Sequence, residues 1–218
     1  MVRWQNQAMV NTCMLAGLFA ALSAVPALAH HPLGGTTPTT FWQGLLSGIG
    51  HPVIGIDHVA FVIAVGVASA FLGLRYLAPA AFILATLVGC LAALATGPMA
   101  HLELLVAASV ALLGILVLSG RSISSPVYMA LFAVAGILHG YAYAGAMIGA
   151  EPTPIAAYLI GLGAAQYAIA AAMTWLTLQT WKAVSPSNIE PRLAGAVVAG
   201  VGLTFLGEHI ETLVLASL

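Results

Sequence analysis

Residues 52–74 read PVIGIDHVAFVIAVGVASAFLGL, and Asp57 and His58 are the only ionisable side chains in this run. A helix needs about 20 mostly apolar residues to cross the hydrocarbon core of a bilayer. The stretch therefore predicts a transmembrane helix. Its aspartate and histidine suggest a functional role, because a charged side chain at mid-bilayer costs about 2.5 to 3.5 kcal/mol.

The whole chain has the composition of a bilayer protein. Of its 218 residues, 61% are hydrophobic and 5% are charged, where a soluble domain carries about 25% charged residues. Five basic and six acidic residues give a net charge of -1, so there is no basic surface to neutralise phosphates and no nucleic-acid partner is expected.

Further apolar runs of similar length follow, separated by short turns that contain proline or glycine. We predict an all-α, polytopic integral membrane protein with about six transmembrane helices. The predicted spans are 52–74, 77–98, 101–118, 126–148, 153–178 and 193–217.

Residues 1–29 have the order of features typical of a cleavable signal peptide. Arg3 lies in a polar start, an apolar run covers 14–22, and Ala27-Leu28-Ala29 forms a small-x-small cleavage site. The alternative is an uncleaved first helix. With cleavage, residues 30–218 form a single six-helix transmembrane domain.

A leader places the mature N-terminus outside, and six spans then place Arg75, Arg121 and the segment 182–192 on the cytoplasmic side. Cytoplasmic loops of membrane proteins carry an excess of Lys and Arg. We therefore expect a multi-pass protein of the bacterial inner membrane with a periplasmic mature N-terminus.

The same topology puts every histidine, and every acidic residue except Glu190, in the outer half of the membrane or outside it.

The most specific group of candidate ligands is His51, Asp57 and His58 at the outer end of the first span. If Pro52 opens that helix, Asp57 and His58 lie about 8 Å deep and His51 lies about 10 Å from His58 along the axis. One straight helix cannot then supply a metal site, so neighbouring helices have to contribute. The alternative is a buried Asp-His hydrogen bond that holds helices together.

Other candidate metal ligands lie on other predicted spans. His139 is in the outer half of the fourth span, although a lone histidine is as readily a polar anchor. His101 and Glu103 open the third span, where a solvated helix start is the alternative. Glu208 and His209 near the end of the last span are better explained as interfacial.

Cleavage would make His30 the N-terminus, and its amine and imidazole with His31 can chelate a transition metal. The alternative is that both merely follow the cleavage site. Imidazole and carboxylate donors favour nickel, cobalt or zinc. There is no P-loop motif and Lys182 is the only lysine, so any transport has to use a gradient or a separate motor subunit.

The run from His51 to His58 resembles the first-span signature of the HupE/UreJ family, permeases for nickel and related metals associated with hydrogenases and ureases. That signature is His, five residues, Asp-His. The leader ending in Ala-His, the six spans and an Ala-His-Leu-Glu segment before the third span extend the resemblance over most of the chain.

The family's second motif is roughly Phe-His-Gly-x-Ala/Val-His-Gly-x-Glu, and His139 begins a match to its first half. Tyr143 then stands where the second histidine is expected, and Ala146 where the glutamate is expected. The resemblance implies that His51, Asp57, His58 and His139 are functional, with Glu151 as a speculative replacement for the missing glutamate.

We therefore expect a secondary permease, not an enzyme, that imports nickel or cobalt through a His/Asp-lined path and has no permanently bound cofactor. One alternative is a membrane-bound metal receptor or accessory subunit that delivers metal to a partner. A less favoured alternative is an intramembrane metalloenzyme. The expected partners are a divalent metal ion and the lipid bilayer. A homo-oligomer or an accessory metal-delivery protein is left open.

Overall fold

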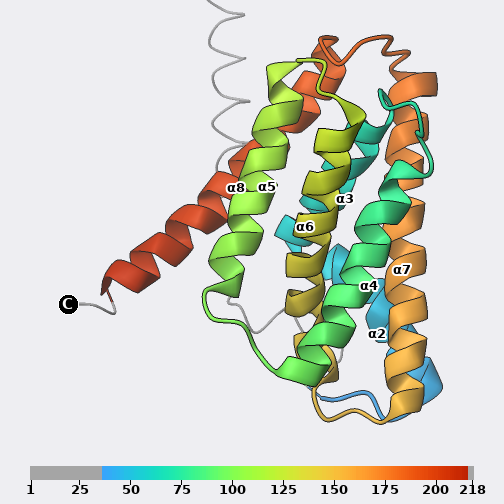
Figure 1. Cartoon of the computed structure of the whole chain (residues 1–218), viewed down its shortest axis with the longest axis vertical. Coiled ribbons are helices and arrows are strands. Elements are labelled where there is room, and N and C mark those ends of the chain that lie inside the picture. Colours follow the sequence, from blue (N-terminus) through green and yellow to red (C-terminus); the bar gives the residue numbers. More distant parts are fainter. Residues whose placement is uncertain (1–35, 216–218) are drawn as a thin grey trace, which may run out of the picture. The chain divides into compact units, whose positions relative to one another are not determined.

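The computed structural model describes residues 36–215, so the predicted signal peptide, His30 and His31 lie outside the described residues. Within this range all regular elements are helical, which confirms the predicted fold class (Figure 1). A 3-10 turn, Gly145–Met147, follows α6, and a π-helical turn, Leu176–Thr180, follows α7. The long helices are α2 Phe41–Ile54, α3 Ile56–Ser69, α4 Ala78–Thr96, α5 Leu102–Ser119, α6 Ser125–Ala144, α7 Pro152–Trp175 and α8 Ile189–Leu215.

Helices α4 to α8, with the short turns that extend α6 and α7, are each long and apolar enough to cross a membrane. The consecutive helices α2 and α3 pass the same test together, although they are bent by 81°. If this pair counts as one crossing, the described part of the chain has the six spans expected from the sequence. The chain is thus a multi-pass membrane protein.

The first crossing differs from the predicted helix 52–74 in both its start and its shape. It begins at Phe41, where Thr40 and Gln43 form a capping box. Pro52 lies inside the last turn of α2 and does not open a helix. Proline lacks an N–H, and Gly55 adopts an extended conformation with φ -75° and ψ 109°. The chain therefore leaves α2 at Gly55 and starts α3 in a new direction.

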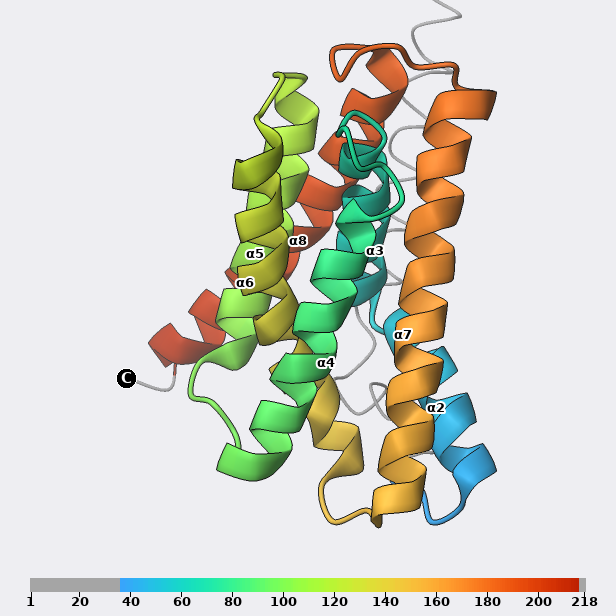
Figure 2. The ribbon, with the colours of Figure 1, turned by 45° about the vertical axis from the view of Figure 1, so that its right-hand side comes forward.

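The helices pack as three close pairs around α3. The pairs are α5 with α8, α4 with α6, and α2 with α7, while α3 contacts all six of the other long helices. Figure 2 shows α2 beside the lower half of α7. Glycines allow the close approach within each pair, because a Cβ atom at Gly48 would collide with the Tyr158 backbone and one at Gly140 with the Thr86 backbone.

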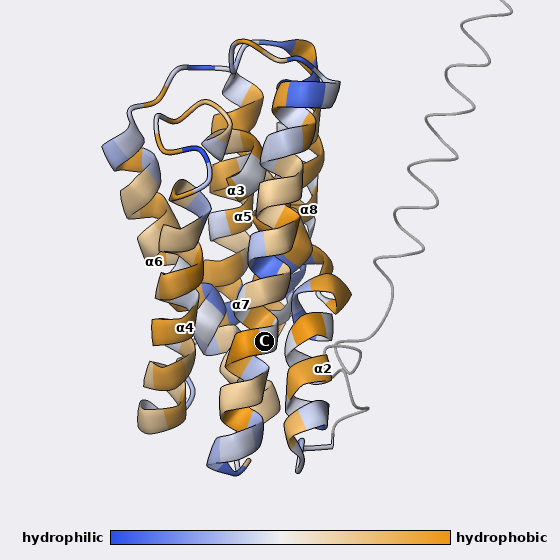
Figure 3. Ribbon diagram, turned by 90° about the vertical axis from the view of Figure 1, so that its right-hand side faces the viewer, coloured by the Kyte–Doolittle hydropathy of each residue, from blue (hydrophilic) through white to orange (hydrophobic). Residues whose placement is uncertain are grey.

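Basic residues gather at one end of the bundle, and Figure 3 shows mainly hydrophobic colours along the helices, with some hydrophilic segments at mid-height. Arg75, Arg121 and Lys182 lie in the turns that follow α3, α5 and α7, and Arg192 lies in the first turn of α8. This end is called the basic end. The turns 97–101 and 148–151 and the start of α2 form the opposite end.

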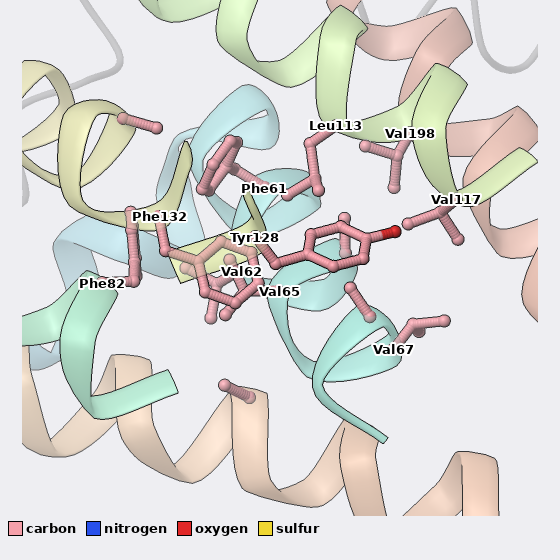
Figure 4. Packing of buried hydrophobic residues seen from close by; sticks show 14 of the residues in the cluster. Phe61, Val62, Val65, Val67, Phe82, Leu113, Val117, Tyr128, Phe132 and Val198 are labelled. Carbon is pink, nitrogen blue, oxygen red and sulfur yellow. The ribbon is translucent and has the colours of Figure 1, made fainter. Parts of the chain in front are cut away.

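Buried apolar side chains form two separate cores, one nearer each end. The basic-side core includes Phe61, Phe82 and Phe132, which come from α3, α4 and α6 (Figure 4). The opposite-side core includes Met147 and Leu162. Both cores are closely packed, and the polar residues described next lie between them.

Candidate metal site

The break between α2 and α3 brings the first-span residues close together. His51 is in the last turns of α2, while Asp57 and His58 are in the first turn of α3. The ring centres of His51 and His58 are 6.3 Å apart. The prediction of one straight helix carrying His51, Asp57 and His58 was wrong, because the chain bends by 81° between α2 and α3 and places His51 on a different helix from the other two.

Gly55 also makes room for the His58 ring. A Cβ atom at position 55 would lie 2.7 Å from Cδ2 of His58, closer than real Cβ contacts. The extended backbone at this break is open to any residue, so glycine matters here for packing: a larger residue would force the His58 ring to move.

His139 of α6 completes the buried group. Its Nδ1 atom lies 3.1 Å from Nδ1 of His58, and Oδ2 of Asp57 lies 3.9 Å from the same His58 nitrogen. His139 is fully buried, and the other three residues are 4 to 5% exposed. His51, Asp57, His58 and His139 are called the central cluster.

The spacing of the two Nδ1 atoms matches that of neighbouring ligands on one metal ion. With metal–nitrogen bonds of about 2.1 Å, two adjacent donors lie about 3.0 Å apart in octahedral and about 3.4 Å apart in tetrahedral geometry. Within residues 36–215, however, no group of three or more His, Cys, Asp or Glu side chains is already arranged to hold a metal. The cluster therefore provides two suitably spaced nitrogen ligands, and a complete metal site needs further donor atoms.

The family was identified by comparison with known proteins. A sequence model described as "HupE / UreJ protein" matches residues 18–205. The chain belongs to the HupE/UreJ family. It is 26% identical over 198 residues to "Protein HupE" of Rhizobium leguminosarum bv. viciae, an alignment covering 85% of this chain and 94% of that protein. No solved structure matches the chain significantly.

HupE/UreJ proteins are accessory membrane proteins of hydrogenases and ureases, implicated in nickel or cobalt uptake. Tyr143 is the residue that the sequence resemblance predicts at the position of the family's second histidine. Its ring centre lies 4.9 Å from that of His51 and 4.5 Å from that of His58. This predicted departure from the family pattern therefore lies directly beside the central cluster. Ala146, at the expected glutamate position, is buried in the short turn after α6.

Three polar contacts of the cluster were not predicted from the sequence. Tyr158 places its hydroxyl oxygen 2.6 Å from Nδ1 of His51 and donates to the Tyr143 carbonyl at 2.9 Å. Ser109 lies 3.1 Å from Nε2 of His139. The sequence did contain a signal for Ser109 and Tyr158, because each is a polar side chain within an apolar span. Burying such a side chain in a membrane costs free energy unless it is hydrogen-bonded.

Gln166 of α7 is fully buried, and neither polar atom of its amide has a hydrogen-bond partner among residues 36–215. It lies beside the Tyr143 hydroxyl, but the two groups do not meet the geometry of a hydrogen bond. Buried amides normally bond to protein or to water. These two polar groups are therefore suited to hold a water molecule or the hydration shell of an ion.

The remaining predicted ligands lie away from the central cluster. His101 and Glu103 line a pocket of about 400 Å³ at the opposite end, together with Tyr141 and His209. Glu151 is exposed and precedes the first turn of α7. The structure thus brings together the four family-signature residues but does not bring Glu151 to them.

Proposed function

We propose that this chain is a secondary permease that carries nickel or cobalt across the bacterial inner membrane. The observation that carries the proposal is the convergence of the central cluster from α2, α3 and α6 between two apolar cores. Imidazole and carboxylate donors suit a borderline divalent ion, and buried ionisable residues inside a membrane typically mark an ion pathway.

The broken first crossing supports the same function. Discontinuous helices place ion sites near the middle of many secondary transporters, because their ends expose polar backbone groups there. Here the break at Gly55 lies directly between His51 and the Asp57-His58 pair.

The membrane potential is a sufficient driving force in this proposal. Each elementary charge gains about 2.3 kcal/mol per 100 mV, so a dication gains about 4.6 kcal/mol on moving toward a negative interior. We place the basic end in the cytoplasm, in keeping with the positive-inside rule. Inward movement then runs from the opposite end to the basic end without ATP.

Uptake of radioactive nickel by vesicles containing the purified protein tests the proposal. An inside-negative potassium diffusion potential should drive accumulation, and collapsing it should stop accumulation. Protein-free vesicles and vesicles with Asp57→Asn are the controls. Nickel binding by the purified protein without accumulation would overturn the permease and favour the receptor alternative. Turnover of a substrate without ion movement would favour a metalloenzyme.

A further inference from the structure

Ser109 is a buried serine on α5 whose hydroxyl faces His139. Its Oγ atom donates to the Val106 carbonyl at 2.7 Å and lies 3.1 Å from Nε2 of His139. A serine hydroxyl has one proton, and a carbonyl oxygen can only accept. Because that proton is used by Val106, the Ser109 oxygen accepts from His139, which must carry its hydrogen on Nε2.

This contact fixes the other nitrogen of His139. A neutral imidazole has one N–H and one lone pair, so Nδ1 of His139 bears the lone pair. That atom faces Nδ1 of His58 at 3.1 Å. Two lone pairs at this distance would repel, and His58 therefore donates from its Nδ1 when the cluster holds no ion.

Tyr158 fixes the tautomer of His51, and this tautomer is the opposite of that of His139. Its single hydroxyl proton goes to the Tyr143 carbonyl at 2.9 Å. The Tyr158 oxygen therefore accepts from Nδ1–H of His51 at 2.6 Å, and in the neutral ring Nε2 of His51 then bears the lone pair.

We propose that Ser109 and Tyr158 are positioning residues that hold His139 and His51 in opposite tautomers, so that His139 offers Nδ1 and His51 offers Nε2 to the ion. The identity of the ion rests on the proposed function, whereas the two tautomers are properties of the protein alone. Hydrogen-bond partners of this kind fix the orientation of ligating histidines and strengthen them as donors. His58 is then the ring whose proton must move, from Nδ1 to Nε2, before it can bind the ion through Nδ1.

Nitrogen-15 NMR of histidine-labelled protein in metal-free nanodiscs at about pH 8.5, where ordinary imidazoles are neutral, tests the tautomers directly. The signals are assigned by their loss in His51→Gln and His139→Gln. We expect Nε2–H for His139 and Nδ1–H for His51.

Variants of the two positioning residues test their roles. Ser109→Ala should abolish the tautomer preference of His139, and Tyr158→Phe should abolish that of His51, each without affecting the other ring. Ser109→Thr retains a hydroxyl that can bond to a preceding helix carbonyl and should keep the wild-type signal.

Nickel binding to the same proteins gives a second readout. We expect Ser109→Ala and Tyr158→Phe to weaken nickel affinity about 10- to 100-fold, and Ser109→Thr to stay within about threefold of wild type. Ser69→Ala and Tyr128→Phe are matched controls, because they remove hydroxyls from buried residues that lie away from the central cluster. Equal losses in the controls would indicate a general packing effect and overturn the positioning role.

An Nδ1–H signal for His139 in the wild-type protein would also overturn the inference, whatever vesicle uptake shows. Conversely, the expected tautomers in a protein that accumulates no nickel would leave the positioning of the rings intact and reject the permease.

Discussion

The aromatic ring of Tyr143 lies 4.5 Å, centre to centre, from the imidazole of His58 and 4.9 Å from that of His51. A side chain on this turn of α6 therefore faces two members of the central cluster at once. A metal ligand placed here would lie next to them, whereas tyrosine contributes mainly an apolar face.

Tyr143→His should accordingly tighten nickel binding by about tenfold or more, because it adds an imidazole beside His51 and His58. Equilibrium dialysis with the purified protein would measure the change. Tyr143→Phe, which keeps the ring and adds no ligand, is the control. If both variants bind nickel equally, position 143 does not face the ion.

Removal of a central-cluster donor should nearly abolish uptake. Asp57→Asn keeps the shape of the side chain but removes its negative charge, and His58→Ala or His139→Ala removes a nitrogen from the closely spaced pair. Radioactive nickel uptake by vesicles, normalised to membrane abundance, is the measurement. His209→Ala at the opposite end should have a milder effect, and wild-type uptake in the first three variants would contradict the site.

Gly55→Ala should lower nickel affinity by about tenfold without removing any ligand. The added methyl would lie 2.7 Å from Cδ2 of His58, so the ring has to rotate away from His139. Gly200→Ala on α8 is the matched control, because no atom of the described part of the chain lies within 4 Å of its added Cβ. Equal affinity in the two variants would show that the break tolerates a side chain.

Gly140→Ala should destabilise the bundle by about 1 to 3 kcal/mol, since the new Cβ would collide with the Thr86 backbone of α4 and force the helices apart. Thermal unfolding in detergent, followed by circular dichroism, would report a lower midpoint. Gly207→Ala, which meets no neighbour, should not lower it.

The sequence was sufficient to predict the long crossings α4 to α8, because a run of about 20 apolar residues has few other solutions. Pro52 was ambiguous, since proline is tolerated at a helix start and also breaks a helix from within. The hydrophobic pattern alone favoured a helix that starts at Pro52. In the structure, Pro52 lies inside α2, and this helix ends at the extended backbone of Gly55. Ionisable side chains within apolar spans indicated His51, Asp57, His58 and His139, and the family resemblance supported the same four. Ser109, Tyr158 and Gln166, in contrast, depend on contacts between helices distant in the chain.

The members of the central cluster come from different helix pairs and from the central helix α3. His51 is carried by the α2 and α7 pair, His139 by the α4 and α6 pair, and Asp57 and His58 by α3 at the centre. The distances between these donors therefore depend on how the two pairs pack against α3, and a small change in that packing alters the cluster without changing any of its residues.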